Sequence, residues 1–183
     1  MIDLDAEFSK ALKAAHDVLN ATYADYCASR TGTSSEYHEI RMQIAIFGYE
    51  MCSELVGFIR NQPTGFAQCV ALKGLVHKLF EYDQLLSAHL VRRMDVLIKA
   101  PNPVASAEMR TERRNWKAQL KRLKGWADVR NSATGHYGRD TSKQIELLSS
   151  LNVAQVMEVS LAFLRCNNAA NYCFAVSAPK GGA

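Results

Sequence analysis

Apolar residues recur at steps of three and four along most of the chain, which is the spacing of amphipathic helices. No alternating pattern typical of strands lasts more than a few residues. Five stripes of this kind can be followed, and we list their inward positions: Leu4, Phe8, Leu12, Ala15, Leu19, Thr22, Tyr26; Ile40, Ile44, Phe47, Met51, Leu55, Phe58; Leu72, Leu75, Leu79, Tyr82, Leu86, Leu90, Arg93, Leu97; Met109, Arg113, Trp116, Leu120, Leu123, Ala127; Val156, Ser160, Phe163, Asn167, Ala170, Phe174. The pattern predicts an all-α fold, an up-and-down helical bundle of about five helices.

Glycine, proline and capping residues mark the ends of these helices. The segment 33–36 has the form of a capping box, and Asn152 is a suitable N-cap for the last helix. We expect the third helix, which continues to Leu97, to be the longest, and residues 139–151 to be irregular. The sequence predicts one helical-bundle domain over residues 1–177 and a flexible C-terminal tail over residues 178–183.

The composition changes this picture little. Of 183 residues, 48% are hydrophobic and 22% charged, as in ordinary globular domains. The five cysteines form no CxxC pair, which favours reduced thiols. The acidic first residues lack the features of a signal peptide, and the most apolar run is too short to span a bilayer. We therefore expect a cytoplasmic protein with no membrane partner.

Charge is concentrated in one part of the chain. Residues 92–124 hold ten basic and three acidic side chains, a net charge of +7, whereas the whole chain has a net charge of +4. Such a concentration favours a surface that faces a polyanion. A solvated helix face without a partner explains the same charges equally well.

Several kinds of site lack their sequence signals. The chain contains no Glu-x-x-His pair for a di-iron centre, no phosphate loop of the GxxxxGK type, no GxGxxG and no GxSxG. We therefore expect no metal and no cofactor.

The fourth stripe leads to an arginine. The next step of three after Ala127 is Arg130, so the pattern directs a guanidinium toward the core. A guanidinium there needs an acidic partner or a cleft that holds an anion. Gly135 can end the helix, which would allow His136 to fold back beside Arg130 and Asn131.

The spacing Arg130-Asn131-x4-His136 resembles the hallmark of the HEPN superfamily. In that hallmark four to six residues, the first of them often Asn, separate Arg from His. Its position near the end of the penultimate long helix of a small bundle agrees. The toxin branch commonly has four residues between Arg and His and a Tyr two residues after His. This chain has five residues between Arg130 and His136, and Tyr137 follows His136 directly. The resemblance therefore assigns no subfamily.

The resemblance implies a metal-independent endoribonuclease that cleaves single-stranded RNA by attack of the 2′-hydroxyl, in toxin–antitoxin systems or phage defence. His136 would transfer protons, Arg130 would bind the scissile phosphate and Asn131 would orient the histidine or bind a phosphate oxygen. A homodimer with a composite active site is implied, and an antitoxin or nucleotidyltransferase is a possible partner. The RNA-binding residues would be Arg110, Arg113, Arg114, Lys117, Lys121 and Arg139.

Two other interpretations stay open. Arg130 and His136 can simply stabilise a helix end by pairing with acids such as Glu54 or Asp128. Alternatively, the chain is a non-catalytic HEPN-like dimeric scaffold that binds nucleic acid or a partner protein.

Overall fold

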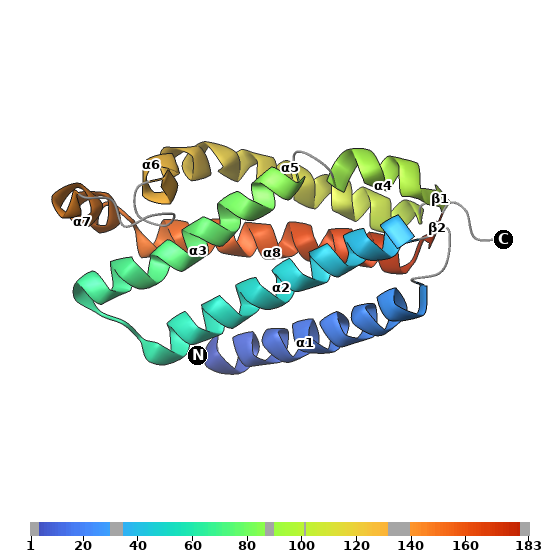
Figure 1. Cartoon of the computed structure of the whole chain (residues 1–183), viewed down its shortest axis with the longest axis horizontal. Helices are drawn as coiled ribbons and strands as arrows, with labels where there is room; N and C mark the ends of the chain where they lie inside the picture. The colour runs from blue at the N-terminus through green and yellow to red at the C-terminus, as the bar shows by residue number, and fades with distance from the viewer. Residues whose placement is uncertain (1–3, 30–34, 87–89, 101, 132–139, 180–183) are drawn as a thin grey trace.

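The computed structural model describes residues 4–29, 35–86, 90–100, 102–131 and 140–179. These residues form eight helical segments (Figure 1): α1 (Leu4–Ser29), α2 (Ser35–Asn61), α3 (Gly65–Leu85), α4 (Val91–Leu97), α5 (Pro103–Gly125), α6 (Ala127–Val129), α7 (Thr141–Ser149) and α8 (Val153–Ala175). The all-α prediction is confirmed at the level of class. The described residues contain more segments than the five that we expected, and α4, α6 and α7 are the additional short ones.

The third predicted helix is described as two segments. α3 ends at Leu85 and α4 begins at Val91, and residues 87–89 lie outside the described residues. Among the described helices α2 is the longest, with 27 residues, whereas α3 has 21; the predicted third helix includes residues outside the described ranges, so its full length stays a prediction.

Helix α7 corrects the prediction of an irregular stretch over 139–151. The Asp140 side chain accepts a hydrogen bond from the backbone N–H of Lys143 at 2.9 Å and so caps the helix. Leu148 is buried on its inner side. A helix of nine residues presents too few apolar positions for a stripe to be recognised in the sequence.

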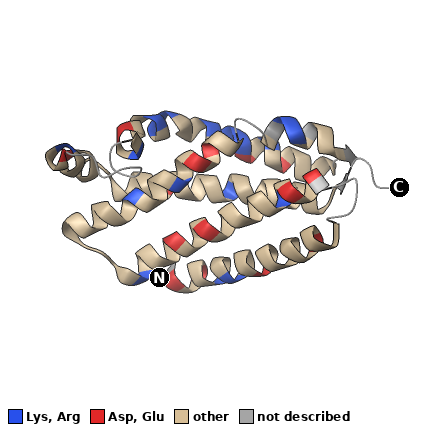
Figure 2. Ribbon diagram, viewed as in Figure 1, with Lys and Arg blue, Asp and Glu red and all other residues tan. Residues whose placement is uncertain are grey.

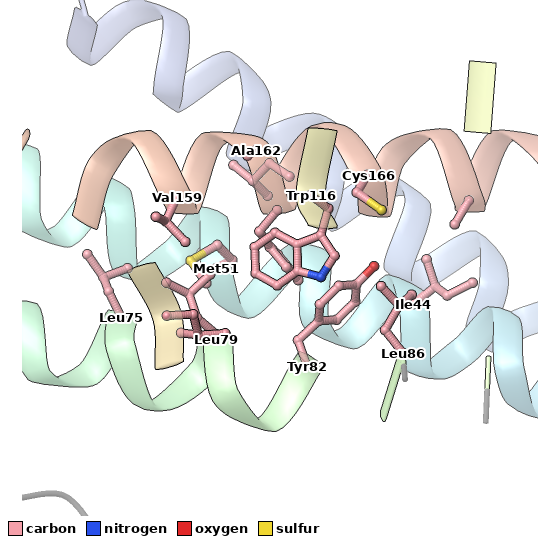
Figure 3. Close-up of a cluster of buried hydrophobic side chains, with 14 of the residues drawn as sticks. Ile44, Met51, Leu75, Leu79, Tyr82, Leu86, Trp116, Val159, Ala162 and Cys166 are labelled. Carbon is pink, nitrogen blue, oxygen red and sulfur yellow. The ribbon is translucent and has the colours of Figure 1, made fainter. Parts of the chain in front are cut away.

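The core lies between α8 and the helices that surround it. α8 contacts α2, α3 and α5, and α1 packs on α2. At the centre, the rings of Tyr82 and Phe163 are in edge contact, with centroids 4.1 Å apart, and Trp116 from α5 joins them. Figure 3 shows Tyr82 and Trp116 side by side, with the Tyr82 hydroxyl directed toward Cys166. α5 is therefore anchored through Trp116, and this fixes which face of α5 is turned to solvent.

The C-terminal end is held by a short strand pair. β1 (Ile98–Ala100) and β2 (Ala178–Pro179) pair antiparallel. The Tyr37 hydroxyl donates hydrogen bonds to the carbonyl oxygens of Phe174 and, at 3.1 Å, Ser177. The predicted tail thus begins with two paired residues instead of a free end, while residues 180–183 lie outside the described residues.

One helix in the described ranges, Glu36–Asn61, is long and apolar enough to cross a membrane by composition, and a second candidate requires the bent pair α7 and α8 to be counted as one span. α2 packs against α1, α3 and α8. An apolar helix with neighbours of this kind is also typical of the core of a bundle in water.

Candidate nucleic-acid interface

The sequence sets up α5 as a helix with a sharply divided surface. Asn102 caps its start by accepting hydrogen bonds from the backbone N–H groups of Val104 and Ala105, and Pro103 occupies the first turn, where its missing N–H costs nothing. Trp116 and Leu123 are buried, whereas the basic residues of the helix are exposed, except Arg113, which is half-buried. Burial of one face therefore leaves the cationic face in solvent.

This cationic face carries most of the charge of α5. The helix has seven basic and two acidic residues, a net charge of +5. Its cations recur at steps of four and three, the spacing that keeps side chains on one face: Arg110, Arg114, Lys117, Lys121 and Lys124. They extend over about 20 Å at 1.5 Å per residue. Figure 2 shows Lys and Arg gathered along α5.

A surface groove of about 420 Å³ lies on this face, and we call it the α5 groove; it is lined by Ala107, Arg110, Thr111, Arg113, Arg114 and Lys117. Four of the six residues that the sequence predicted for RNA binding line it. Lys121 is exposed one turn beyond Lys117, and Arg139 lies outside the described residues. The structure therefore brings together most of the predicted RNA-binding set.

The cations of the α5 groove differ from their neighbours in how they are paired. Among the described residues, Arg110, Arg113 and Lys117 form no ion pair, whereas Arg93 pairs with Glu36 at 3.1 Å and Arg122 pairs with Glu158. An unpaired cation retains its full attraction for an anion. The groove is thus the part of the basic stretch best suited to a polyanion.

Arg130 does not face the core as the uninterrupted stripe predicted. The helix is broken at Trp126, whose backbone (φ −99°, ψ 12°) departs from helical values and whose side chain is buried. The break changes the helical phase, so that Val129 takes the inward position and the Arg130 side chain is 34% exposed. Gly125, directly before Trp126, is a residue that can end a helix, but the predicted stripe ran through it to Ala127.

Arg130 contacts two groups through its guanidinium. Nη2 lies 3.5 Å from Oε1 of Glu81 on α3, and Nη1 donates to Oδ1 of Asn131 at 3.2 Å. The predicted neighbours Arg130 and Asn131 are therefore in contact. Glu81 is an acidic partner of Arg130 that the sequence analysis did not name, and no local signal in the sequence links Glu81 to a residue so far along the chain.

His136, the predicted proton-transfer residue, lies outside the described residues. The segment that contains it joins α6 to α7, and these two helices are in contact with each other. α7 also packs against α3, which carries Glu81 (Figure 1). The helices on the two sides of this segment therefore contact each other, and α7 also contacts the helix that carries Glu81, the partner of Arg130.

The titratable groups beneath α5 are held in their neutral forms. Burial is the main cause that raises the pKa of the Cys166 thiol to about 11, and burial also raises the pKa of Tyr82 well above its usual value. Among the described residues no group of three or more His, Cys, Asp or Glu side chains is placed to hold a metal ion. The chemical contribution of this surface is therefore the positive charge of the residues that line the α5 groove.

No family model, no curated protein and no solved structure matches this chain. Fold and site together define an all-α protein with a cationic groove on α5 and an arginine–asparagine pair beyond the end of that helix.

Proposed function

We propose that this protein is a HEPN-like, metal-independent endoribonuclease that cleaves single-stranded RNA. The observation that carries the proposal is the cationic α5 groove, which lies on the long helix that precedes α6 and the contacting pair Arg130 and Asn131. A polyanion bound along α5 would be directed toward the helix end that holds this pair. The positions of the basic residues suit a polyanion such as RNA because each cation can neutralise a phosphate.

In the proposed chemistry Arg130 binds the scissile phosphate with its planar donors as negative charge accumulates in the transition state. The hydrogen bond from Arg130 to Asn131 orients the guanidinium, and Asn131 keeps its amide N–H groups for a phosphate oxygen or for His136. The imidazole of His136 takes the proton of the 2′-hydroxyl or gives one to the leaving 5′-oxygen. The 2′-oxygen attacks the phosphorus, so the product ends in a 2′,3′-cyclic phosphate.

One histidine cannot serve at the same moment as acid and as base. We therefore propose a homodimer in which two Arg130–His136 motifs face each other across a two-fold axis. A cytoplasmic role in toxin–antitoxin or phage defence, with an antitoxin or nucleotidyltransferase as partner, belongs to the same proposal.

The test is cleavage of a labelled, unstructured RNA in the presence of EDTA. The wild type should cut, His136→Ala should bind without cutting, and Arg130→Lys should fail because an ammonium cannot make a two-pronged contact. Products with a 3′-hydroxyl end, a requirement for magnesium, or full activity in His136→Ala would contradict the mechanism.

One observation favours a second candidate, the non-catalytic scaffold. The contact between Arg130 and Glu81 gives the guanidinium an acidic partner within the fold, as a purely structural arginine would have. Binding of RNA that weakens with salt, without cleavage under any condition tested, would support this candidate.

A further inference from the structure

The α5 groove contains more than a row of charges, because one of its arginines is fixed. Nη2 of Arg114 donates to Oγ1 of Thr111 at 3.3 Å, and Oγ1 of Thr111 donates to the carbonyl oxygen of Ala107 at 3.1 Å. This chain of hydrogen bonds holds the guanidinium of Arg114 back along the helix, over the part of the groove lined by Ala107 and Thr111. This hydrogen bond favours conformations that keep the guanidinium on that part of the groove.

We propose that the α5 groove is a nucleotide subsite in which one unpaired base of the RNA stacks on the guanidinium of Arg114. The methyl groups of Ala107 and Thr111 provide the apolar floor for that base. Arg110, Arg113 and Lys117, which have no ion pair in the described chain, bind the adjoining phosphates. The inference deepens the proposed function by requiring RNA binding, and it does not depend on cleavage.

The chemistry separates the roles of the four cations. A guanidinium that is already hydrogen bonded along its edge has fewer donors left for phosphate, but both of its faces remain suitable for stacking on a base. Arg110, Arg113 and Lys117 serve best as phosphate ligands because no hydrogen bond within the described residues occupies their donors. Arg114 therefore contributes contact with a base, and the other three contribute charge.

Stacking on a side chain requires a base that is not already stacked in a duplex. The subsite therefore selects single-stranded RNA. An acidic protein or an anionic lipid surface would use the charges of the groove equally well but would gain nothing from the planar face of Arg114. That difference makes the inference testable.

The probe is a fluorescent single strand of about ten nucleotides with 2′-O-methyl ribose, which spans a site of this size and lacks the nucleophile for cleavage. A matched abasic strand carries the same phosphates without bases. Arg114→Lys preserves the charge and removes the planar group, and Arg122→Lys makes the same change on α5 outside the groove. Anisotropy titrations of both strands give the affinities.

Arg114→Lys should weaken binding of the base-bearing strand about tenfold and leave binding of the abasic strand unchanged. Thr111→Val, which removes the hydroxyl that accepts the hydrogen bond from Arg114, should also weaken binding of the base-bearing strand, by a smaller factor than Arg114→Lys. Arg122→Lys should bind both strands as the wild type does. Because Arg114 and Thr111 are exposed, these changes leave the core intact, and thermal unfolding of each variant checks this.

Equal affinity of the wild type for the base-bearing and abasic strands, or no loss in Arg114→Lys, would overturn the subsite. Because the strand cannot be cleaved, this outcome is separate from the fate of the proposed ribonuclease. If the protein does not cut RNA but still binds the base-bearing strand more tightly than the abasic strand, the proposed subsite stands and the proposed ribonuclease activity is refuted. Tighter binding to anionic vesicles or to a polyglutamate peptide than to the base-bearing strand would also refute the inference.

Discussion

The ion pair between Glu81 and Arg130 offers the most direct test of what Arg130 does. Replacing Glu81 with Gln keeps the size and shape of the side chain and removes its charge. At 3.5 Å, two unit charges attract by about 1 kcal/mol in a water-like dielectric. Both side chains are at least one third exposed, so solvent screening reduces the contribution of the pair to the free energy of unfolding below about 1 kcal/mol.

The consequence for RNA is opposite in sign. If Arg130 binds a phosphate, the carboxylate of Glu81 competes with that phosphate and adds a repulsive charge beside it. Glu81→Gln should therefore tighten binding of an uncleavable RNA by up to about fivefold at low salt, the equivalent of about 1 kcal/mol. The gain should shrink as salt is added, because these groups are partly exposed.

The matched control is Glu50→Gln. Glu50 on α2 pairs with Lys78 on α3 at 3.0 Å, and neither residue belongs to the proposed site. Urea unfolding and anisotropy titration should show similar small losses of stability in both variants, and tighter RNA binding only in Glu81→Gln. A loss of stability well above 1 kcal/mol in Glu81→Gln, with unchanged RNA affinity, would mean that Arg130 serves the fold and not a ligand.

Two further predictions concern the core. Tyr37→Phe should lower the free energy of unfolding by about 1–2 kcal/mol because two buried carbonyl groups lose the O–H that they share, whereas Tyr82→Phe should cost less, since its buried hydroxyl is directed toward the weak thiol partner Cys166 and has no hydrogen bond of normal geometry in the described chain; equal losses in urea would refute this contrast. The pKa of Cys166 is raised in the folded state from the usual 9.0 to about 11, so its neutral thiol adds stability that is fully present below pH 9 and is lost as the pH rises toward 11. In urea unfolding across that range, the stability advantage of the wild type over Cys166→Ala should therefore shrink, and an advantage that stays constant with pH would contradict the assigned shift.

The sequence predicted what depends on local spacing. The stripes of the long helices and the cap at Asn152, whose side chain accepts from the backbone N–H of Gln155 at 3.0 Å, are present in the structure. The inner positions predicted for α5 also include Trp116 and Leu123, and both are buried.

What depends on tertiary packing could not be predicted in this way. The break at Trp126 follows from burying an indole that an amphipathic pattern treats as any other apolar residue. The pairing of Arg130 with Glu81 depends on how α3 lies beside α6, and a single sequence carries no record of that contact. The hydrogen bond from Arg114 to Thr111 depends on side-chain conformation, although its spacing of three residues is one that a helix permits.

The proposed dimer can be tested by mixing. Each chain supplies one histidine to the proposed site, whereas cleavage uses an acid and a base. If His136 of one protomer acts as acid while His136 of its partner acts as base, a mixed dimer of wild type and His136→Ala is inactive. After subunit exchange in an equal mixture, the activity per protomer should fall to about a quarter of the wild-type value, the fraction of wild-type homodimers, whereas independent sites would retain about half. Sedimentation shows whether dimers are present at the concentration of the assay, and monomers that cleave RNA would refute the composite site. A value of one half with dimers present would mean that each His136 works alone, so that the second proton-transfer group must come from water or from the RNA.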